Sequence, residues 1–450
     1  MKGTIKISAP YVEQTESDIF GPAVRLAADV EMINPNTRVN EKRPLFFEFE
    51  RRYEEYLCPE RSDAFVMGLL STAMENDCNI EFKTPMTDRL FYQMNDDYLP
   101  MMAKYNANFP LSDIRLSGPV TSAELLTGGG GYGVATGCSC GVDSLYTVYK
   151  KTHCSVDRYN LTHLFCHSCG TLDCNEERIK ALYTRIYRRV ENLSAYLGLE
   201  ACGCWTNIHT FYKFPYKIFC YFYTTTAAGC VFALQKLFSV YYESSSYTLE
   251  QIHLEALQNY SGTLDGSMLD IYTLPCMNTD TLTFYSAGTE ATRIEKQEAI
   301  ADYPAAQKFL SVCGIEYDGG EIAENKYNCS RCEKCVRTMT NFYAINKLDN
   351  FAGVFDVQDY KANFAKRLGR WMGICKKHYI HDLMPRLRQN NIKIPFGARV
   401  YALLFWRPYS FLKKKLRNSR FMRRLYYKFN IDKKIHGYRS SVSEAYKDLM

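Results

Sequence analysis

The chain has 450 residues, which is enough for two or three domains, and a net charge of +6. Hydrophobic residues make up 46% and charged residues 23%, as in ordinary soluble globular proteins. No N-terminal stretch combines a positive start with an apolar run, so we expect no secretory signal and a cytoplasmic location. The longest uncharged run, 218–235, contains three consecutive threonines and a glycine, which favours a buried helix over a membrane span.

Residues 1–125 are expected to form an N-terminal α+β unit. Residues 44–50 alternate like a half-buried strand, 63–74 are typical of an apolar helix, and 79–82 of a short strand. Nothing in this unit has catalytic spacing. The glycine run 128–131 is expected to be a flexible joint.

From 132 to 340 the pattern changes to alternating strands and helices, which indicates a doubly wound parallel sheet with helices on both faces. Strands are expected at 133–138, 161–166, 200–206 and 240–244, and helices at 143–151, 175–197 and 223–238.

The most informative segment is the turn between the first of these strands and its helix. It reads Ser139, Cys140, Gly141, Val142, Asp143, Ser144. A strand, a glycine-containing turn and a helix start can direct several backbone N–H groups, together with the positive end of the helix dipole, at a phosphate. Ser139 and Ser144 could add hydroxyls, and Gly141 would permit a close approach.

These six residues resemble the SGGxDS signature of the PP-loop ATP pyrophosphatases, which adenylate a substrate and release pyrophosphate. The resemblance implies that ATP and Mg²⁺ bind at residues 139–144, with Asp143 capping the helix or helping to hold Mg²⁺. Cys140 occupies the position of the family's first glycine, so either that position tolerates a side chain or its backbone angles differ.

Ligands of such sheets bind beyond the carboxyl ends of the strands. His167 follows the second expected strand, and the serines 244–246 follow the fourth, so both should lie on the same rim as the turn. Because the corresponding segment borders the adenine in the PP-loop family, His167 is a candidate nucleotide-binding residue; the alternative is an ordinary loop histidine.

A second strong signal is Cys329, Cys332 and Cys335, whose spacing suits a tetrahedral metal ion. We expect a structural Zn²⁺ held by four cysteines within the segment 313–337, with Cys313 as the fourth ligand and Cys276 as the alternative. An iron–sulfur cluster and metal-free cysteines stay open. The chain contains 18 cysteines, several of them in apolar segments, which fits a reducing compartment better than a disulfide framework.

The combination of this turn with a later cysteine trio resembles the 7-cyano-7-deazaguanine synthases, which activate a carboxylate with ATP, pass it to ammonia and hold zinc with four cysteines. The resemblance covers roughly 132–340. In the synthases the first cysteine lies much closer to the trio than Cys313 does, and this chain is about twice as long. The resemblance therefore supports the activation chemistry and leaves the substrate open.

Residues 288–296, together with the cysteine motif, also resemble uncharacterised PP-loop proteins encoded among bacterial surface-polysaccharide genes, which implies a sugar or acyl substrate. Arg293 and Lys296, three residues apart, would share a helix face and could neutralise departing pyrophosphate. The alternative is a solvated charged face.

Other cysteines give weaker signals. Cys166, Cys169 and Cys174 could form a second metal site or a redox pair, or their loop could simply tolerate cysteine. The pairs Cys138 with Cys140 and Cys202 with Cys204 alternate along strands, and burial is the expected reason.

Residues 341–450 are expected to form a helical, basic C-terminal region. Between 399 and 439 there are 13 Lys or Arg and one acid, interspersed with aromatic residues. Three functions fit: contact with an anionic membrane surface at the inner membrane face, binding of nucleic acid, or a solvated face of a helical bundle.

Together these patterns predict an ATP-dependent, adenylate-forming, ligase-like enzyme. A substrate carboxylate or carbonyl oxygen would attack the α-phosphate, and a nucleophile such as ammonia would then displace AMP. The alternatives are an ATP-dependent epimerase, an enzyme that transfers sulfur to RNA, and a non-catalytic nucleotide-binding scaffold.

Overall fold

The computed structural model describes residues 2–37, 39–105, 112–123, 131–169, 176–212, 215–258, 266–313, 327–374, 377–409 and 411. The chain divides into two compact units. The first comprises Met1–Ser139 and Thr147–Glu290, and the second comprises Cys140–Tyr146 and Ala291–Met450.

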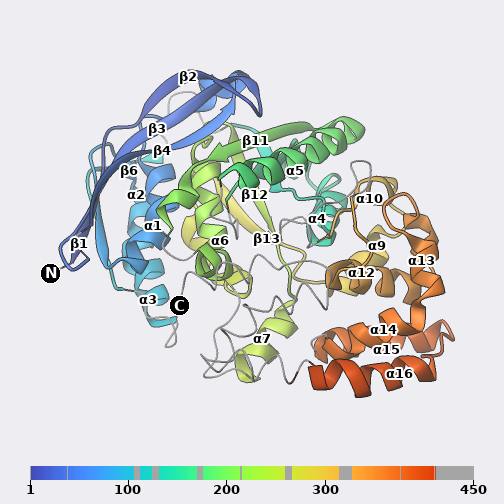
Figure 1. The fold of residues 1–450 in the computed structure, drawn as a ribbon. Helices are drawn as coiled ribbons and strands as arrows, with labels where there is room; N and C mark the ends of the chain where they lie inside the picture. Colours follow the sequence, from blue (N-terminus) through green and yellow to red (C-terminus); the bar gives the residue numbers. More distant parts are fainter. Residues whose placement is uncertain are drawn as a thin grey trace. The chain divides into compact units, whose positions relative to one another are not determined.

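An α/β architecture with a large mixed, mostly parallel sheet is the core of the first unit (Figure 1). Its parallel half consists of β9 (Gly133–Gly137), β10 (His163–His167), β11 (Glu200–Thr206), β12 (Phe238–Ser244) and β13 (Thr283–Ala287). These strands lie in the order β13-β12-β9-β10-β11, and every neighbouring pair is parallel. The strand order reverses between β9 and β12, and this is where ligands bind in open α/β sheets.

The N-terminal strands extend this sheet instead of forming one of their own. Thr206 and Trp205 of β11 pair antiparallel with Phe47 and Glu48 of β4. Beyond β4 the order continues β3-β1-β5-β7, and β2 pairs with β3. These strands are β1 (Gly3–Ile7), β2 (Tyr11–Ser17), β3 (Gly21–Asn34), β4 (Val39–Glu50), β5 (Cys78–Phe82) and β7 (Leu116–Ser117); β6 (Met86–Thr87) and β8 (Val120–Thr121) pair separately.

Helices cover both faces of the sheet, as the alternation of side chains along β11 shows. On one face, a Cβ added to Gly203 would lie 2.7 Å from the Tyr187 ring of α5 (Glu176–Leu197). On the other, Cys202 and Cys204 belong to the same buried core as α1 (Asp63–Glu75) and α6 (Pro215–Phe232), which pack against each other. The run expected as a buried helix corresponds to α6, which begins and ends earlier than predicted. No described helix is both long and apolar enough to span a membrane.

The remaining described α-helices of the first unit are α2 (Asp88–Tyr92), α3 (Leu99–Tyr105), α7 (Leu249–Gln258) and α8 (Asp270–Thr273). Helix α4 (Val142–Lys151) begins in the second unit and ends in the first. The second unit is otherwise helical, with α9 (Arg293–Ile300), α10 (Pro304–Phe309), α12 (Glu333–Ala344), α13 (Val357–Ala362), α14 (Phe364–Ile374), α15 (Lys377–Gln389), α16 (Phe396–Tyr401) and the π-helix η9 (Ala402–Trp406). This agrees with the expected C-terminal helical region. The glycines 128–130 and the tail beyond 411 lie outside the described residues.

Candidate functional site

The turn before α4 contains a residue with left-handed backbone angles. Cys140 has a φ of +57°, in the left-handed region that favours glycine, and its thiol is fully buried. Its carbonyl accepts a hydrogen bond of 2.8 Å from the amide of Ser311, which holds this conformation. The unusual backbone angle explains why a glycine would suit the position, and burial places the thiol out of solvent.

Replacement of Cys140 therefore has a predictable order of effects. Cys140→Gly relieves the left-handed strain and loses a buried sulfur, so the free energy of unfolding should change by less than about 1 kcal/mol. Cys140→Val adds a branched side chain at positive φ and should cost about 2 kcal/mol or more. Cys138, buried without positive φ, is the control, and there valine should be tolerated better than glycine. Denaturant unfolding measures the free energies of unfolding of the Gly and Val variants at both positions. If glycine were also more stable than valine at position 138, the positive φ of Cys140 would not explain the preference.

The start of α4 presents backbone donors. Among the described residues no acceptor is found for the amides of Gly141, Val142 and Ser144, as expected for the first turn of a helix. The Ser144 hydroxyl donates back to the Gly141 carbonyl at 3.2 Å. Ser139, exposed before the turn, is the last residue of the first unit. The first turn of α4 can thus accept an anion.

Two cations of α9 meet the acid of this turn within the second unit. Helix α9 begins with a capping box, in which Thr292 accepts from the Glu295 amide and Glu295 accepts from the Thr292 amide. The cap fixes Arg293 and Lys296 on one face. Arg293 Nη2 lies 2.5 Å from Asp143 Oδ2, and Lys296 Nζ lies 3.5 Å from Asp143 Oδ1.

The cluster is largely removed from solvent. The Lys296 side chain is 1% exposed, and those of Arg293 and Asp143 are 18% and 19% exposed. Burial alone would raise the pKa of Asp143, but Arg293, Lys296 and, more weakly, Arg337 outweigh it and hold this pKa below its ordinary value. One negative and two positive charges at the start of a helix favour an anionic ligand.

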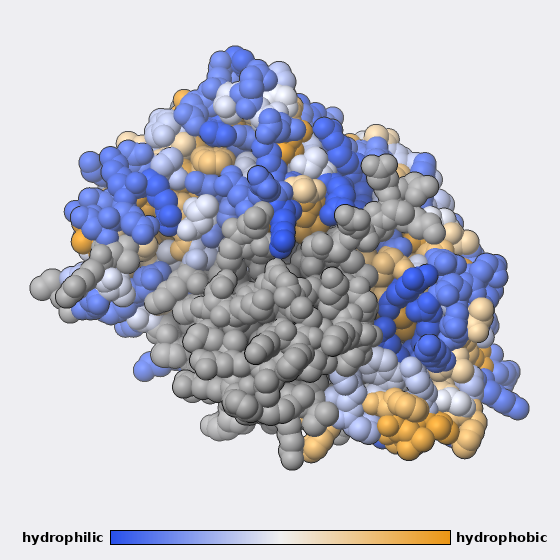
Figure 2. Space-filling model, viewed as in Figure 1, coloured by the Kyte–Doolittle hydropathy of each residue, from blue (hydrophilic) through white to orange (hydrophobic). Residues whose placement is uncertain are grey.

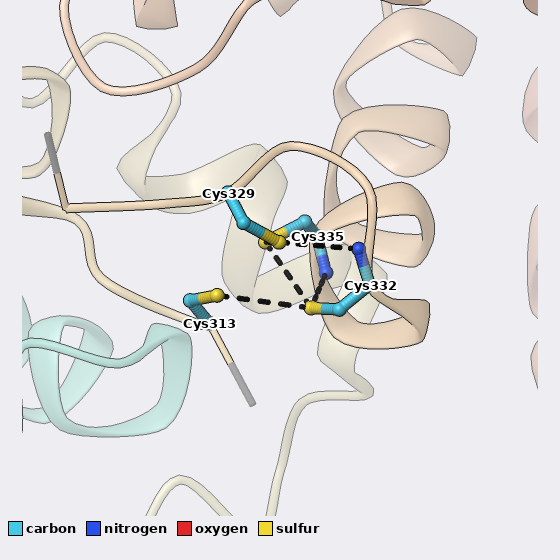
Figure 3. Close-up of side chains that lie close together, drawn as sticks. All are labelled: Cys313, Cys329, Cys332 and Cys335. Carbon is cyan, nitrogen blue, oxygen red and sulfur yellow. Dashed lines mark hydrogen bonds between the residues drawn. The ribbon is translucent and has the colours of Figure 1, made fainter. Parts of the chain in front are cut away.

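The four expected cysteines converge (Figure 3). All four sulfur atoms lie within 4.8 Å of one another, with Sγ–Sγ distances of 3.9 Å for Cys313–Cys332, 3.8 Å for Cys329–Cys335 and 3.4 Å for Cys332–Cys335. Sulfurs at about 2.3 Å from a tetrahedral Zn²⁺ are about 3.8 Å apart, so the residues fit the metal. Cys313, and not Cys276, completes the set.

Polar contacts hold the cysteine segments in place. Asn328 donates to the carbonyls of Leu310 and Val354 and accepts from the amide of Val312, next to Cys313. The Cys332 sulfur is the N-cap of α12 and accepts from the Cys335 amide. Such amide–sulfur contacts stabilise thiolates, the form that binds metal.

Helix α12 connects the cysteine site with α9. The buried Gln297 of α9 donates to the Thr338 carbonyl at 3.0 Å and accepts from Asn341 at 2.8 Å. Arg337 of the same helix lowers the pKa of Asp143. The cysteine cluster therefore lies at the beginning of the helix whose Arg337 lowers the pKa of Asp143.

In the first unit, a polar cluster lies at the carboxyl edge of the sheet, on the α6 face. Tyr241 and Glu243 alternate onto this face of β12, and Ser286 of β13 pairs beside Glu243. The Tyr241 hydroxyl would lie 2.7 Å from a Cβ at Gly137, so glycine is needed there. Within the described residues, the buried Tyr241 hydroxyl, Ser286 hydroxyl and His167 Nδ1 have no hydrogen-bond partner.

His167 is the last residue of β10 and lies, like the polar cluster, on the face of the sheet that α6 covers. Its Nε2 lies 3.4 Å from the hydroxyl of Tyr223, on α6. Burial lowers the pKa of His167 to about 4, so its ring is neutral at pH 7. A neutral, hydrogen-bonding histidine suits an uncharged polar group of a ligand, such as a heterocycle.

Glu243 is a functional candidate that the sequence patterns did not reveal. Its side chain is nine-tenths buried, and no described residue hydrogen-bonds its carboxyl group. Burial, and then the neighbouring Asp270, raise its pKa well above the ordinary value. Thr224 hydrogen-bonds Asp270 at 2.7 Å. A buried acid whose carboxyl group accepts no hydrogen bond from the described residues, at the carboxyl edge of a sheet, can hold or move a proton.

The raised pKa of Glu243 has a consequence for stability. Above about pH 4.3 the unfolded chain loses this proton while the native state keeps it, so stability falls by about 1.4 kcal/mol per pH unit until the native pKa is passed. Glu243→Gln should abolish this loss and become increasingly more stable than the wild type between pH 5 and 8. Urea unfolding across this range tests it. The control is Glu81→Gln at an exposed position. If the free energies of unfolding of Glu243→Gln and the wild type differed by the same amount at every pH, the pKa of Glu243 would not be raised in the native state.

The weaker cysteine signals are only partly described. Cys169 lies 3.2 Å from Cys230 of α6, sulfur to sulfur, and both are buried; Cys174 lies outside the described residues. Cys202 and Cys204 are buried, as expected.

Comparisons with protein-family models, curated proteins and solved structures found no match to this chain. The function therefore has to be argued from the geometry of its own residues.

Proposed function

We propose that the chain is an ATP-dependent adenylating enzyme that converts ATP to AMP and pyrophosphate while activating a substrate carboxylate. One observation supports this above others: the buried Asp143, Arg293 and Lys296 cluster lies at the first turn of α4, where amides lack acceptors among the described residues. A helix start beside one buried and one largely buried cation is an arrangement that suits phosphate groups.

In the proposed reaction the substrate oxygen attacks the α-phosphorus, and the bond between that phosphorus and the bridging oxygen of pyrophosphate breaks. The amides of Gly141, Val142 and Ser144 would hold the leaving pyrophosphate, and Arg293 and Lys296 would balance its growing charge. Asp143 would orient both cations. Mg²⁺, when bound, would share the phosphate charge. A nucleophile such as ammonia would then displace AMP from the adenylate.

The zinc would have no part in these steps. Four thiolates close its coordination sphere, which is typical of structural sites, and α12 would transmit its effect to α9.

A sugar-linked or deazaguanine-like carboxylate is the proposed substrate class, in a cytoplasmic setting.

The test is product analysis. Protein incubated with ATP, Mg²⁺ and a panel of carboxylic acids, including uronic acids and 7-carboxy-7-deazaguanine, should release AMP and pyrophosphate with at least one acid. Release of ADP and phosphate would overturn the adenylation mechanism. Failure of ATP to raise the melting temperature would overturn nucleotide binding itself.

A further inference from the structure

Large apolar side chains are exposed together on the last described helices of the second unit. Figure 2 shows hydrophobic residues gathered over this region. The exposed fractions are 81% for Phe396, 53% for Leu403, 67% for Leu404, 60% for Phe405 and 63% for Phe411.

These exposed side chains are distinct from the side of α16 and η9 that packs against the rest of the unit. Helix α16 and η9 already bury Ala398 and Ala402 and pack against α14. The contact is close: a Cβ at Gly369 would lie 2.6 Å from the Ala398 carbonyl, and one at Gly373 would lie 2.2 Å from Trp406. The five exposed residues, which we call the apolar stripe, therefore form a second face that points outward.

A groove of about 420 Å³ adjoins this stripe. Its lining combines apolar side chains with three cations, and consists of Met384, Leu387, Arg388, Ile392, Lys393, Ile394, Phe396 and Arg399. A groove with apolar walls and basic groups matches a molecule that has an acyl chain and an anionic head group.

The charge of the surrounding sequence has one sign. Between residues 383 and 431 there are 13 Lys or Arg and no Asp or Glu. Each such cation near an anionic surface strengthens binding about fivefold, since it contributes about 1 kcal/mol. Among these, Arg386 is engaged with Glu298 and Glu295, whereas Arg388, Lys393 and Arg399 line the groove.

We propose that residues 384–409 and Phe411 dock on an anionic phospholipid surface, with lipid phosphates at the cations of the groove and Leu403, Leu404 and Phe405 at the acyl boundary. Phe396, Phe405 and Phe411 would suit stacking on bases as well as an acyl layer, whereas the adjacent Leu403 and Leu404 suit only the acyl layer, so the composition favours lipid over nucleic acid. Such docking would place the enzyme beside a lipid-linked or membrane-associated substrate, but it does not depend on the ATP chemistry.

The test is sedimentation of the full chain with vesicles of phosphatidylcholine, with and without phosphatidylglycerol. Binding should require phosphatidylglycerol and weaken with salt. The variant Arg388→Gln/Lys393→Gln/Arg399→Gln should bind about a hundredfold more weakly, whereas Lys83→Gln/Lys104→Gln, a control on the first unit, should not. Leu403→Gln/Leu404→Gln/Phe405→Gln should lose at least tenfold, and the exposed pair Tyr92→Gln/Tyr272→Gln should not.

Equal binding to both vesicle types, or apolar variants that bind like the wild type, would overturn the proposal. So would tighter binding to single-stranded polyuridylate that depends on the cations alone, which would assign the surface to nucleic acid. All variants should keep the ATP-induced rise in melting temperature, so this proposal and the proposed function can fail separately.

Discussion

Cys332→Ser is expected to abolish stoichiometric zinc binding and the cooperative unfolding of the second unit. Cys332 contributes to two of the three short sulfur–sulfur contacts and caps α12. Structural zinc supplies an apparent 10–16 kcal/mol in small zinc domains, about as much as the whole stability of a domain. The loss should therefore exceed that of any substitution in this unit outside the four cysteines.

Metal analysis and calorimetry measure the effect. The wild type should hold one zinc per chain, and cobalt substitution should give the visible spectrum of a tetrahedral thiolate site. A chelator should lower the melting temperature of the wild type and leave Cys332→Ser unchanged. Cys276→Ser, the matched control, should retain the metal. A wild type that holds no zinc after purification with the metal, or a Cys276→Ser variant that loses it, would refute the assignment.

The sequence was most informative where the relevant contacts are local. The turn after β9 and the trio at 329, 332 and 335 could be predicted because their geometry depends on neighbouring residues. The α6 boundaries were less accurate, since Pro215 begins the helix before the apolar run that attracted attention.

Contacts between residues far apart in the sequence could not be predicted from local patterns. Arg293 and Asp143 are 150 residues apart, and only the fold brings them together. The N-terminal strands alternate correctly, but no local pattern states that β4 pairs with β11. Local patterns specify elements, and the choice of partner depends on the packing of the whole chain.

Glu243 is an acid in a mostly apolar strand, which is a feature visible in the sequence alone. An acid inside the apolar strand Phe238–Ser244 should be rare, because burying a carboxylate without a partner is costly. The serines 244–246 that follow Glu243 are the more conspicuous feature of the sequence. A charged side chain in an otherwise apolar strand, near its carboxyl end, is therefore a useful signal in α/β sequences.

Lys296→Met is expected to fold and to bind ATP about a hundredfold more weakly. Methionine has a similar length and lacks the charge, and Asp143 keeps its ion pair with Arg293. A hydrogen bond to a charged group contributes about 1.5–3 kcal/mol, and its upper end corresponds to about a hundredfold in affinity. The control Lys308→Met removes an exposed lysine from α10 and should bind ATP normally.

Substitution of the acid instead of the lysine separates an effect on stability from an effect on ATP binding. Asp143→Asn leaves Lys296 buried beside a neutral amide, so it should destabilise the fold by about 3–5 kcal/mol, whereas Lys296→Met should cost much less. ATP at 100 times its dissociation constant stabilises a protein by about 2.7 kcal/mol, and a hundredfold weaker affinity reduces this to about 0.4 kcal/mol. Thermal unfolding with and without ATP and Mg²⁺ thus measures both effects. If Lys296→Met keeps the full ATP-induced stabilisation, the two cations of α9 serve only to neutralise Asp143, and the phosphate site lies elsewhere.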